Sequence, residues 1–230
     1  MNRPKGLVIA IDGPAGAGKS TLASRIARKH GYLNIETGAM YRALALKAIL
    51  SDISFEDETA LLRLATDSHI ALEPKINGNR VLLDGENVSD RIREQDVTNA
   101  ASKVSVHPKV REWMVARQRE MGMQGGVVME GRDIGTKVFP DADVKIFLDA
   151  APEVRGNRRF QQHQTGSPQQ EASVIAEMKD RDQRDRSRVN SPLVAASDAI
   201  TIDSTSMTLD EVISRAEALI DERLKQAPKK

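Results

Sequence analysis

The residues whose types and spacing most clearly predict chemistry lie near the N-terminus, where Gly13 to Thr21 read GPAGAGKST. This stretch matches the pattern G-x-x-x-x-G-K-[ST]. It directly follows a predicted strand and leads into a predicted helix, as the pattern requires. Glycines in such a loop let the backbone wrap closely around phosphate groups, so that amide N–H groups and a helix N-terminus form an anion site. The pattern therefore predicts a loop that binds nucleotide phosphates.

Two side chains of this loop have predicted roles of their own. Lys19 is expected to reach the β and γ oxygens of ATP, and the Ser20 hydroxyl is expected to face Mg²⁺. The alternative is a glycine-rich turn with a solvated lysine, and the loop alone does not indicate which reaction occurs. The residues expected to bind ATP here are Gly13, Pro14, Ala15, Gly16, Ala17, Gly18, Lys19, Ser20 and Thr21.

Three further segments are rich in groups suited to anionic ligands. ETGAMYR (36–42) follows the second predicted strand, EGRDIGT (130–136) follows the third, and RDQRDRSR (181–188) precedes the last. Because the carboxyl ends of parallel strands line the ligand crevice of an open α/β sheet, the first two segments should share a cleft with the loop. The chain lacks an N-K-x-D motif after a late strand, which counts against a GTPase switch protein. Two phosphorylated substrates are implied.

The elements that must position these residues alternate between short apolar runs and helical patterns, which is typical of a parallel sheet with crossover helices. A helix is predicted from Ser20 to His30, where Gly31 ends it, and another from Thr208, where Glu211 completes a capping box. The predicted strands are Leu7–Ile11, Tyr32–Ile35, Val127–Met129, Val144–Leu148 and Ile200–Ile202.

Between the second and third of these strands the pattern changes. From Ser68 to about Val88, short alternating segments are separated by the turn signals NGN (77–79) and DGEN (84–87). They predict a small antiparallel sheet inserted into the core, continued by helical stretches on either side of Pro108. We therefore expect one domain over residues 1–230 with an inserted region at 68–120.

Composition narrows the classes of protein. The 230 residues include 34 Lys and Arg against 33 Asp and Glu, and aromatic residues make up only 3%. This balance argues against a nucleic-acid-binding surface. The absence of Cys excludes disulfides and thiolate sites, and four scattered His leave little for a His-based metal site. The apolar run that begins at Leu7 stops at Asp12, too soon for a signal peptide or a membrane span, so we expect a cytoplasmic protein.

Five segments together resemble, in content and order, the bacterial cytidylate (CMP/dCMP) kinases, over about Gly6 to Leu224. Two departures keep the needed chemistry: Ser20 stands where many members carry Gly, and Thr37 where many carry Ser. The segments are GPAGAGKST, ETGAMYRALAL, TNAASKVSVHPKVRE, EGRDIGTKVFPDADVKIFLDA and RDQRDRSR.

The resemblance implies an α/β P-loop nucleoside monophosphate kinase fold. Its parts are a parallel five-stranded core sheet with helices on both faces, an inserted monophosphate-binding region at 68–120 with a small antiparallel sheet, and a short lid at 152–190. The implied activity is transfer of the γ-phosphoryl group of ATP to CMP or dCMP, with Mg²⁺ as cofactor. We expect a monomer whose partners are ATP and CMP or dCMP, with no nucleic acid and no membrane.

The resemblance also assigns roles to individual residues. Arg42, Arg132 and Arg188 would clamp the CMP phosphate, because a planar guanidinium suits bidentate phosphate contact. Together with Lys19, Arg132 and Arg188 would act in catalysis. Arg158 would lie on the ATP side of the lid, where Arg159, Arg184 and Arg186 are further candidates. For the base and sugar, the assignments are Ser102, Arg111 and Asp133 on cytosine and Arg181 with Asp185 on the ribose.

Chemistry independently supports one assignment, because the exocyclic amino group of cytosine is a donor that a carboxylate such as Asp133 accepts well, whereas uracil presents an acceptor there. Other assignments keep their structural alternatives. Arg188 and the lid arginines could form ordinary ion pairs on a solvated helix. Thr37 and Tyr41 follow the second strand, and Tyr41 could pack near the phosphate or base, or equally in the core.

Two other functions fit parts of the pattern. A P-loop kinase for another small acceptor, such as a sugar acid or dephospho-coenzyme A, would have no room for a base reader, whereas the insert and Asp133 supply one. A regulatory protein that binds ATP without transferring phosphate would not need two arginine-rich acceptor segments. The arginine segments therefore favour the kinase of a phosphorylated acceptor.

Overall fold

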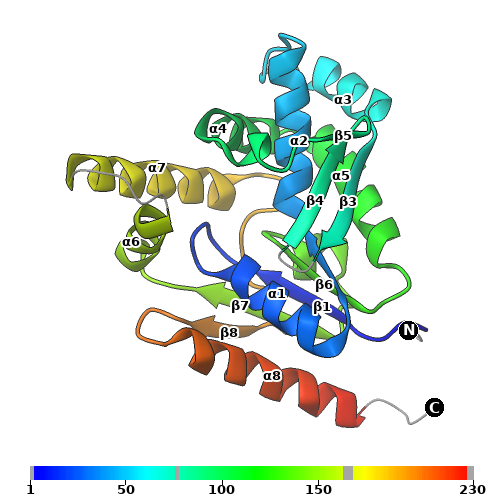
Figure 1. Cartoon of the computed structure of the whole chain (residues 1–230), viewed down its shortest axis with the longest axis vertical. Helices are drawn as coiled ribbons and strands as arrows, with labels where there is room; N and C mark the ends of the chain where they lie inside the picture. The colour runs from blue at the N-terminus through cyan, green and yellow to red at the C-terminus, as the bar shows by residue number, and fades with distance from the viewer. Residues whose placement is uncertain (1–2, 76–77, 163–167, 227–230) are drawn as a thin grey trace.

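The five strands predicted from the sequence form the central sheet. A computed structural model describes residues 3–75, 78–162 and 168–226. Its core sheet has the order β2-β6-β1-β7-β8, and all neighbouring strands pair in parallel (Figure 1). The strands are β1 (Val8–Asp12), β2 (Leu33–Glu36), β6 (Val127–Gly131), β7 (Val144–Asp149) and β8 (Ile200–Asp203).

Each strand lies within two residues of its predicted bounds, and the differences at the C-terminal ends of the strands share a cause. Pairing continues past the apolar run into a polar end: Asp12, Glu36, Asp149 and Asp203 are last in their strands, and Glu130 is last but one in β6. Parallel pairing requires only backbone groups, so an acidic side chain at the open edge does not end the strand. As a result, five carboxylates gather at the carboxyl edge of the sheet.

Helices cover both faces of this sheet, as predicted. Alternate β1 residues point to opposite faces. Ile9 and Ile11 pack with α1 (Lys19–His30) and α8 (Leu209–Gln226), which lie side by side in Figure 1. On the other face, Val8 and Ala10 pack with the π-helical turn η2 (Ile134–Val138).

The helix ends that the sequence predicted are also present. Gly31 follows α1 in the left-handed conformation with φ 65°, which favours glycine. At the start of α8, the Glu211 amide donates to the Thr208 hydroxyl at 3.3 Å, and the Thr208 amide donates to the Glu211 carboxylate at 2.7 Å. Thr208 is therefore the cap, and the helix begins one residue later than predicted.

The inserted region contains the predicted antiparallel sheet, in the order β3-β4-β5. Asp84 and Gly85 join β4 to β5 with φ of 52° and 89°, which matches the type I′ turn that DGEN predicts. The other turn signal, NGN, includes residues outside the described ranges. The elements of this part of the chain are α2 (Thr37–Leu50), α3 (Glu58–Asp67), β3 (Ile70–Lys75), β4 (Gly78–Leu83), β5 (Glu86–Asn87), η1 (Arg91–Arg93), α4 (Gln95–Val104) and α5 (Pro108–Gly122).

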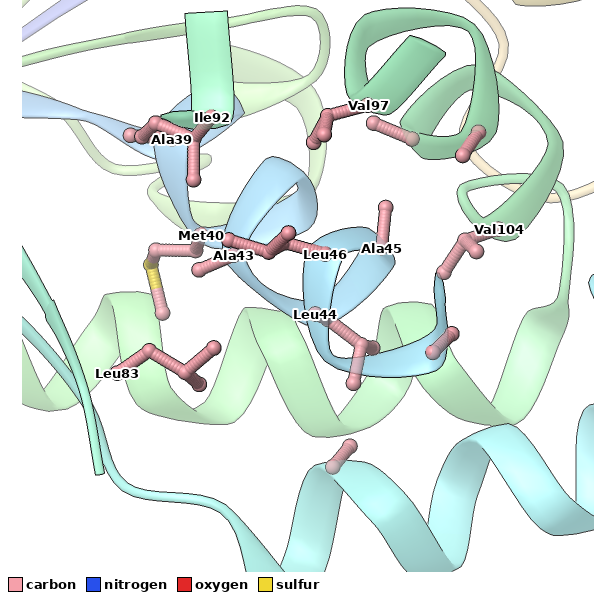
Figure 2. Close-up of a cluster of buried hydrophobic side chains, with 14 of the residues drawn as sticks. Ala39, Met40, Ala43, Leu44, Ala45, Leu46, Leu83, Ile92, Val97 and Val104 are labelled. Atoms are coloured by element: carbon pink, nitrogen blue, oxygen red, sulfur yellow. The ribbon is translucent and has the colours of Figure 1, made fainter. Parts of the chain in front are cut away.

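A second apolar core surrounds α2, as Figure 2 shows. Met40 and Leu44 are fully buried on this helix, and they pack with Ile92 of η1, Val104 of α4 and Leu83 of β4. A helix that is apolar all round must lie inside a core. The insert therefore shares its core with α2 and α3, upstream of residue 68, and α2 joins this core directly to the end of β2.

The remaining helices are α6 (Pro152–Gln162) and α7 (Pro168–Ser187), which form a pair above the end of the core sheet (Figure 1). Among the described residues, no helix is both long enough and apolar enough to cross a membrane.

Candidate active site

The phosphate loop runs from the end of β1 into α1 with a backbone that requires glycine. Gly16 and Gly18 have φ of 74° and 98°. A Cβ on Gly16 would lie 2.7 Å from Cε of Met178 and 3.1 Å from the carbonyl oxygen of Arg155. Gly18 is the N-cap of α1, so the first amides of this helix are free to bind an anion.

Lys19 is buried within this loop, with only 6% of the residue exposed. Its ammonium donates to the carbonyl oxygen of Pro14 at 2.7 Å, which folds the side chain back over the loop. Burial and the neighbouring Arg132 lower the pKa of Lys19 to about 7. An anionic ligand would raise this pKa again, because an opposite charge favours the ammonium form.

Two cavities open from the loop. The larger has a volume of about 1160 Å³ and the smaller about 200 Å³. They meet at seven residues that line both: Gly16, Lys19, Ser20, Glu36, Arg42, Arg159 and Arg181. This junction is rich in cations, as a site for phosphoryl transfer between two bound ligands requires.

The larger cavity contains most of the residues predicted to bind ATP. Its wall includes Gly16 to Thr21 and Arg158, with apolar surface from Leu148 and Met207. Arg158 donates to the hydroxyl and carbonyl oxygens of Ser204 at 3.1 and 2.8 Å, which fixes its guanidinium against this wall. Of the other loop residues predicted for ATP, Ala15 lines the smaller cavity, and Gly13 and Pro14 line neither.

The smaller cavity brings together nine of the ten residues predicted to bind the second substrate. They come from four separate parts of the chain: α2, α5, the segment after β6, and the end of α7 with the residue that follows it. The nine are Thr37, Tyr41, Arg42, Arg111, Arg132, Asp133, Arg181, Asp185 and Arg188. The tenth, Ser102, is buried in α4 but lines neither cavity, and the α4 positions that reach the smaller cavity wall are Ala101 and the C-cap Ser105.

Four arginines of the smaller cavity have carboxylate partners. Arg42 pairs with Glu36, and Arg111 pairs with Asp133 at 2.5 Å. A third carboxylate, Asp185, bridges two arginines: its two oxygens lie 2.9 Å from Arg132 Nε and 3.0 Å from Arg188 Nη2.

Burial would raise the pKa of Asp185, but the charges of Arg132 and Arg188 outweigh it and hold the pKa below its usual value. Asp185 is therefore a permanent anion between two cations. From the sequence alone, Arg188 could equally form an ordinary ion pair on a solvated helix. Arg188 does form an ion pair, but it lies in the wall of the smaller cavity.

Tyr41 forms one wall of the same cavity. The guanidinium of Arg111 lies 5.4 Å from the centre of its ring, within the range of a cation–π contact. Burial raises the pKa of Tyr41 to about 12, so the phenol stays neutral. Tyr41 also packs against the second apolar core, so the same side chain contributes to the core and to the cavity wall.

Sequence reasoning gave no role to two acidic residues at strand ends, Glu36 and Glu130. The Glu130 carboxylate accepts a hydrogen bond from the Ser20 hydroxyl at 2.9 Å, and its backbone oxygen accepts one from the Thr37 hydroxyl at 2.8 Å. Burial and the nearby Glu36 raise the pKa of Glu130 to about 7. The signal that could have identified them is their position: each opens one of the segments ETGAMYR and EGRDIGT.

A third acidic residue, Asp12, was also missed. Its two carboxylate oxygens accept from the amides of Ile134 and Gly135 at 2.8 and 2.7 Å. Burial raises the pKa of Asp12 to about 6, although these two amides lower it. Asp12 thus fixes the turn that directly follows Asp133.

The residues present fit Mg²⁺ bound together with a nucleotide. Within the described ranges, no group of three or more His, Cys, Asp or Glu is placed to hold a metal ion alone. Mg²⁺ normally takes only one or two protein ligands and completes its shell with waters and substrate phosphates. The Ser20 hydroxyl, held by Glu130 beside the loop, is a donor of this kind.

The arginines of the region predicted as a lid separate into two groups. Arg159 and Arg181 line both cavities, and burial lowers the pKa of Arg181 to about 10 without removing its charge at neutral pH. Arg184 and Arg186 line neither cavity. Arg184 bonds to the backbone oxygen of Asp180, one turn earlier in α7, as expected for a helix surface.

Comparisons with known proteins identify the family of the chain. The family model for cytidylate kinase matches residues 9–222. A cytidylate kinase from Geobacillus kaustophilus is 49% identical over 217 residues, which cover 94% of this chain and 97% of the relative. A cytidylate kinase from Enterococcus faecalis is 47% identical over 216 residues, which cover 94% and 96% of the two chains.

A solved structure of an uncharacterised protein from Eubacterium ventriosum is similar with a TM-score of 0.51 and 14% identity, covering 95% of this chain and 99% of that one. At this identity the similarity concerns the fold alone. The family match, by contrast, runs from β1 to α8 and includes both cavities. On the strength of that match, the chain belongs to the cytidylate kinase family.

Proposed function

We propose that this protein transfers the γ-phosphoryl group of ATP to CMP or dCMP, giving ADP and CDP or dCDP. The observation that carries the proposal is the meeting of the two cavities at Lys19, Ser20 and Arg42. A nucleoside triphosphate in the larger cavity and a monophosphate in the smaller one would place their phosphates at this junction. Family membership supports the same reaction.

On the donor side, the loop amides and Lys19 hold the triphosphate, and Arg158, which is bonded to Ser204, lines the same cavity. Mg²⁺, when bound at Ser20 with the nucleotide, would neutralise charge on the β and γ oxygens. Arg159 and Arg181 supply positive charge from the lid at the junction.

On the acceptor side, Arg42, Arg132 and Arg188 bind the phosphate of CMP. Each of these three arginines already pairs with a carboxylate of the protein, so its guanidinium is placed to bind the oxygens of an anion. Asp133 and Arg111 are a buried ion pair in the wall of the same cavity, where Arg111 lies over the Tyr41 ring. There the Asp133 carboxylate accepts from the amino group of cytosine. Arg181 and Asp185 keep the role on the ribose that the family resemblance predicts. The contact of Ser102 with cytosine stays a prediction, because Ser102 is buried and lines neither cavity.

The chemical step needs positioning and charge neutralisation more than proton transfer. An oxygen of the CMP phosphate attacks the γ-phosphorus, and the bond from this phosphorus to the β–γ bridging oxygen breaks. The electron pair leaves with ADP. Lys19 and the arginines of the junction stabilise the oxygens that gain charge. Because the attacking group is already an anion, no general base is needed.

A coupled assay of ADP release tests the proposal directly. We expect CMP and dCMP to be the best acceptors in a panel that also contains UMP, AMP, gluconate, shikimate and dephospho-coenzyme A. A sugar acid or dephospho-coenzyme A as the best acceptor would contradict it. If no acceptor supports turnover, a single-turnover measurement with labelled ATP and CMP would identify a regulatory ATP-binding protein. The monomeric state, the cytoplasmic location and the absence of nucleic-acid partners stay predictions.

A further inference from the structure

One charged side chain of the lid lies outside both cavities and yet contacts the phosphate loop. Arg155, in the first turn of α6, is 3% exposed. Its Nε donates to the carbonyl oxygen of Ala150 at 2.8 Å, and its Nη1 donates to the carbonyl oxygen of Ala15 at 3.0 Å. The same Nη1 lies 2.5 Å from a carboxylate oxygen of Asp182 in α7. One guanidinium therefore joins the loop, the end of β7 and the second lid helix.

The contact with the loop has a direct effect on its phosphate-binding face. In a trans peptide, the carbonyl and the following N–H point in opposite directions. Arg155 holds the Ala15 carbonyl toward α6. The Gly16 amide of the same peptide is therefore directed away from α6. Gly16 lines both cavities. Arg155 thus fixes the orientation of a backbone donor at the junction.

The contact with Asp182 reaches the acceptor cavity. Asp182 follows Arg181, which lines both cavities, and lies one turn before Asp185, which bridges Arg132 and Arg188. A shift or rotation of α7 at Asp182 would therefore displace the carboxylate that orients two arginines of the phosphate clamp. Asp182 itself is 7% exposed, so its pairing with Arg155 is a buried one.

We infer that Arg155 is a positioning residue that couples the phosphate loop to α7, so that ATP and CMP bind cooperatively. The inference rests on the proposed function, because it requires both sites to be occupied. Contacts join Ala15 to Arg155 and Arg155 to Asp182, and one turn of α7 connects Asp182 to Asp185. Close packing supports it, since a Cβ at Gly16 would lie only 2.7 Å from Cε of Met178 in α7.

The chain offers a matched control. Lys179 and Glu153 also join α7 to α6, at 3.2 Å, but they lie on the surface with side-chain exposures of 54% and 64%. This pair does not reach the loop. If the two lid helices only needed to be held together, loss of either pair would affect ligand binding in the same way.

The test measures the dissociation constant of CMP by calorimetry, with and without a saturating non-hydrolysable ATP analogue. In the wild type, we expect the analogue with Mg²⁺ to tighten CMP binding about fivefold or more, a typical coupling between two sites. In Asp182→Asn, affinity for the analogue alone should stay within about twofold of the wild type, while the tightening of CMP falls below about twofold. Lys179→Met should behave as the wild type.

Replacing Arg155 with Met should weaken the analogue as well, because the Ala15 carbonyl loses its donor. If a single variant fails to fold because a buried charge is left unpaired, Arg155→Met combined with Asp182→Leu removes both charges, and the coupling should again be lost. Wild-type coupling in any folded variant of Arg155 or Asp182, or no coupling in the wild type, would overturn the inference. Failure of the wild type to bind CMP at all would instead overturn the proposed function.

Discussion

The donor and acceptor sides of the proposed active site use different chemical groups: backbone groups on one side and charged side chains on the other. On the proposed donor side, backbone groups of one continuous loop line the larger cavity, and Gly16 and Gly18 set their directions. On the acceptor side, side chains from four parts of the chain converge, and Arg42, Arg111, Arg132 and Arg188 each face a carboxylate. The donor side thus uses fixed dipoles, whereas the acceptor side uses charges that are balanced internally.

This difference determines what a ligand must do on arrival. The loop amides need only exchange water for phosphate. The acceptor phosphate must compete with Glu36 and Asp185 for the arginines, so its binding energy is reduced by the strength of those ion pairs. An acceptor side of this kind holds its arginines in place when empty, and it favours ligands that offer both a phosphate and a second group for Asp133 and Arg111.

The largest effect is expected on the donor side, from Lys19→Ala. The variant removes the charge nearest to the β and γ oxygens but leaves the backbone cradle in place. Loss of one preorganised contact of this kind reduces kcat by about 10²- to 10³-fold. Steady-state kinetics with CMP and ATP measure it, with circular dichroism to verify the fold. Lys29→Ala, an exposed change in the same helix, should keep wild-type kcat. Near-native turnover of folded Lys19→Ala would show that the loop acts without its lysine.

The second effect concerns the phosphate clamp on the acceptor side. Arg132→Ala removes one partner of Asp185 and leaves this carboxylate facing the CMP phosphate. We expect kcat/KM for CMP to fall on the order of a hundredfold, the range found when one member of a buried charge pair is lost. Arg42→Ala should have a similar effect.

The exposed pair of Arg117 with Glu120 gives the control, and Arg117→Ala should leave kcat/KM unchanged. Values within a few-fold of the wild type in both clamp variants would mean that the acceptor phosphate binds elsewhere.

The third effect concerns base choice. In Asp133→Asn, an amide that can face either edge of a pyrimidine replaces a carboxylate that accepts only from cytosine. The ratio of kcat/KM for CMP to that for UMP should fall by about tenfold to a hundredfold. Asp96→Asn, which breaks an exposed pair with Arg91, is the matched control. An unchanged ratio in folded Asp133→Asn would move the search for the base reader to Ser102 and Arg111.

The smallest effect concerns the competition between Glu36 and the CMP phosphate for Arg42. Glu36→Gln removes the internal anion that faces Arg42, with both side chains still partly exposed to solvent. Since a pair of this kind is worth about 1 kcal/mol, KM for CMP should fall by about threefold to tenfold. Inorganic phosphate should become a better inhibitor by a similar factor. A higher KM would show that Glu36 orients Arg42 for the substrate and does not compete with it.

Much of the fold could be predicted because its signals are local. Buried apolar runs define the strands, and the capping pair of Thr208 and Glu211 defines the start of α8. The turn η2 could not be predicted, because it depends on Asp12, more than a hundred residues earlier, accepting from Ile134 and Gly135. For the same reason, nothing near α2 shows that its apolar residues belong to the core of the insert.

The residues of the site likewise divide into those that local sequence predicts and those that depend on tertiary packing. The loop is one continuous motif, and Arg42 and Arg132 follow strands whose ends must meet. By contrast, the bridging position of Asp185 and the contact of Arg155 with the loop depend on how α6 and α7 pack. Ser102 and Ser105 lie three residues apart in and after α4, and only Ser105 lines the smaller cavity. Which of the two reaches the cavity wall depends on how α4 packs, and the sequence alone does not show this.

The buried carboxyl group of Asp12 also changes how many protons the chain binds when it folds. Its pKa is about 6 in the folded protein, against an ordinary value of 3.8. Between these values, the folded protein keeps a proton that the unfolded chain has released. Folding therefore takes up a proton near pH 5, and the stability from this group is full below pH 4 and lost as pH rises through about 6. The loss amounts to about 3 kcal/mol. At neutral pH the ionised Asp12 holds two amides firmly while making the whole chain easier to unfold.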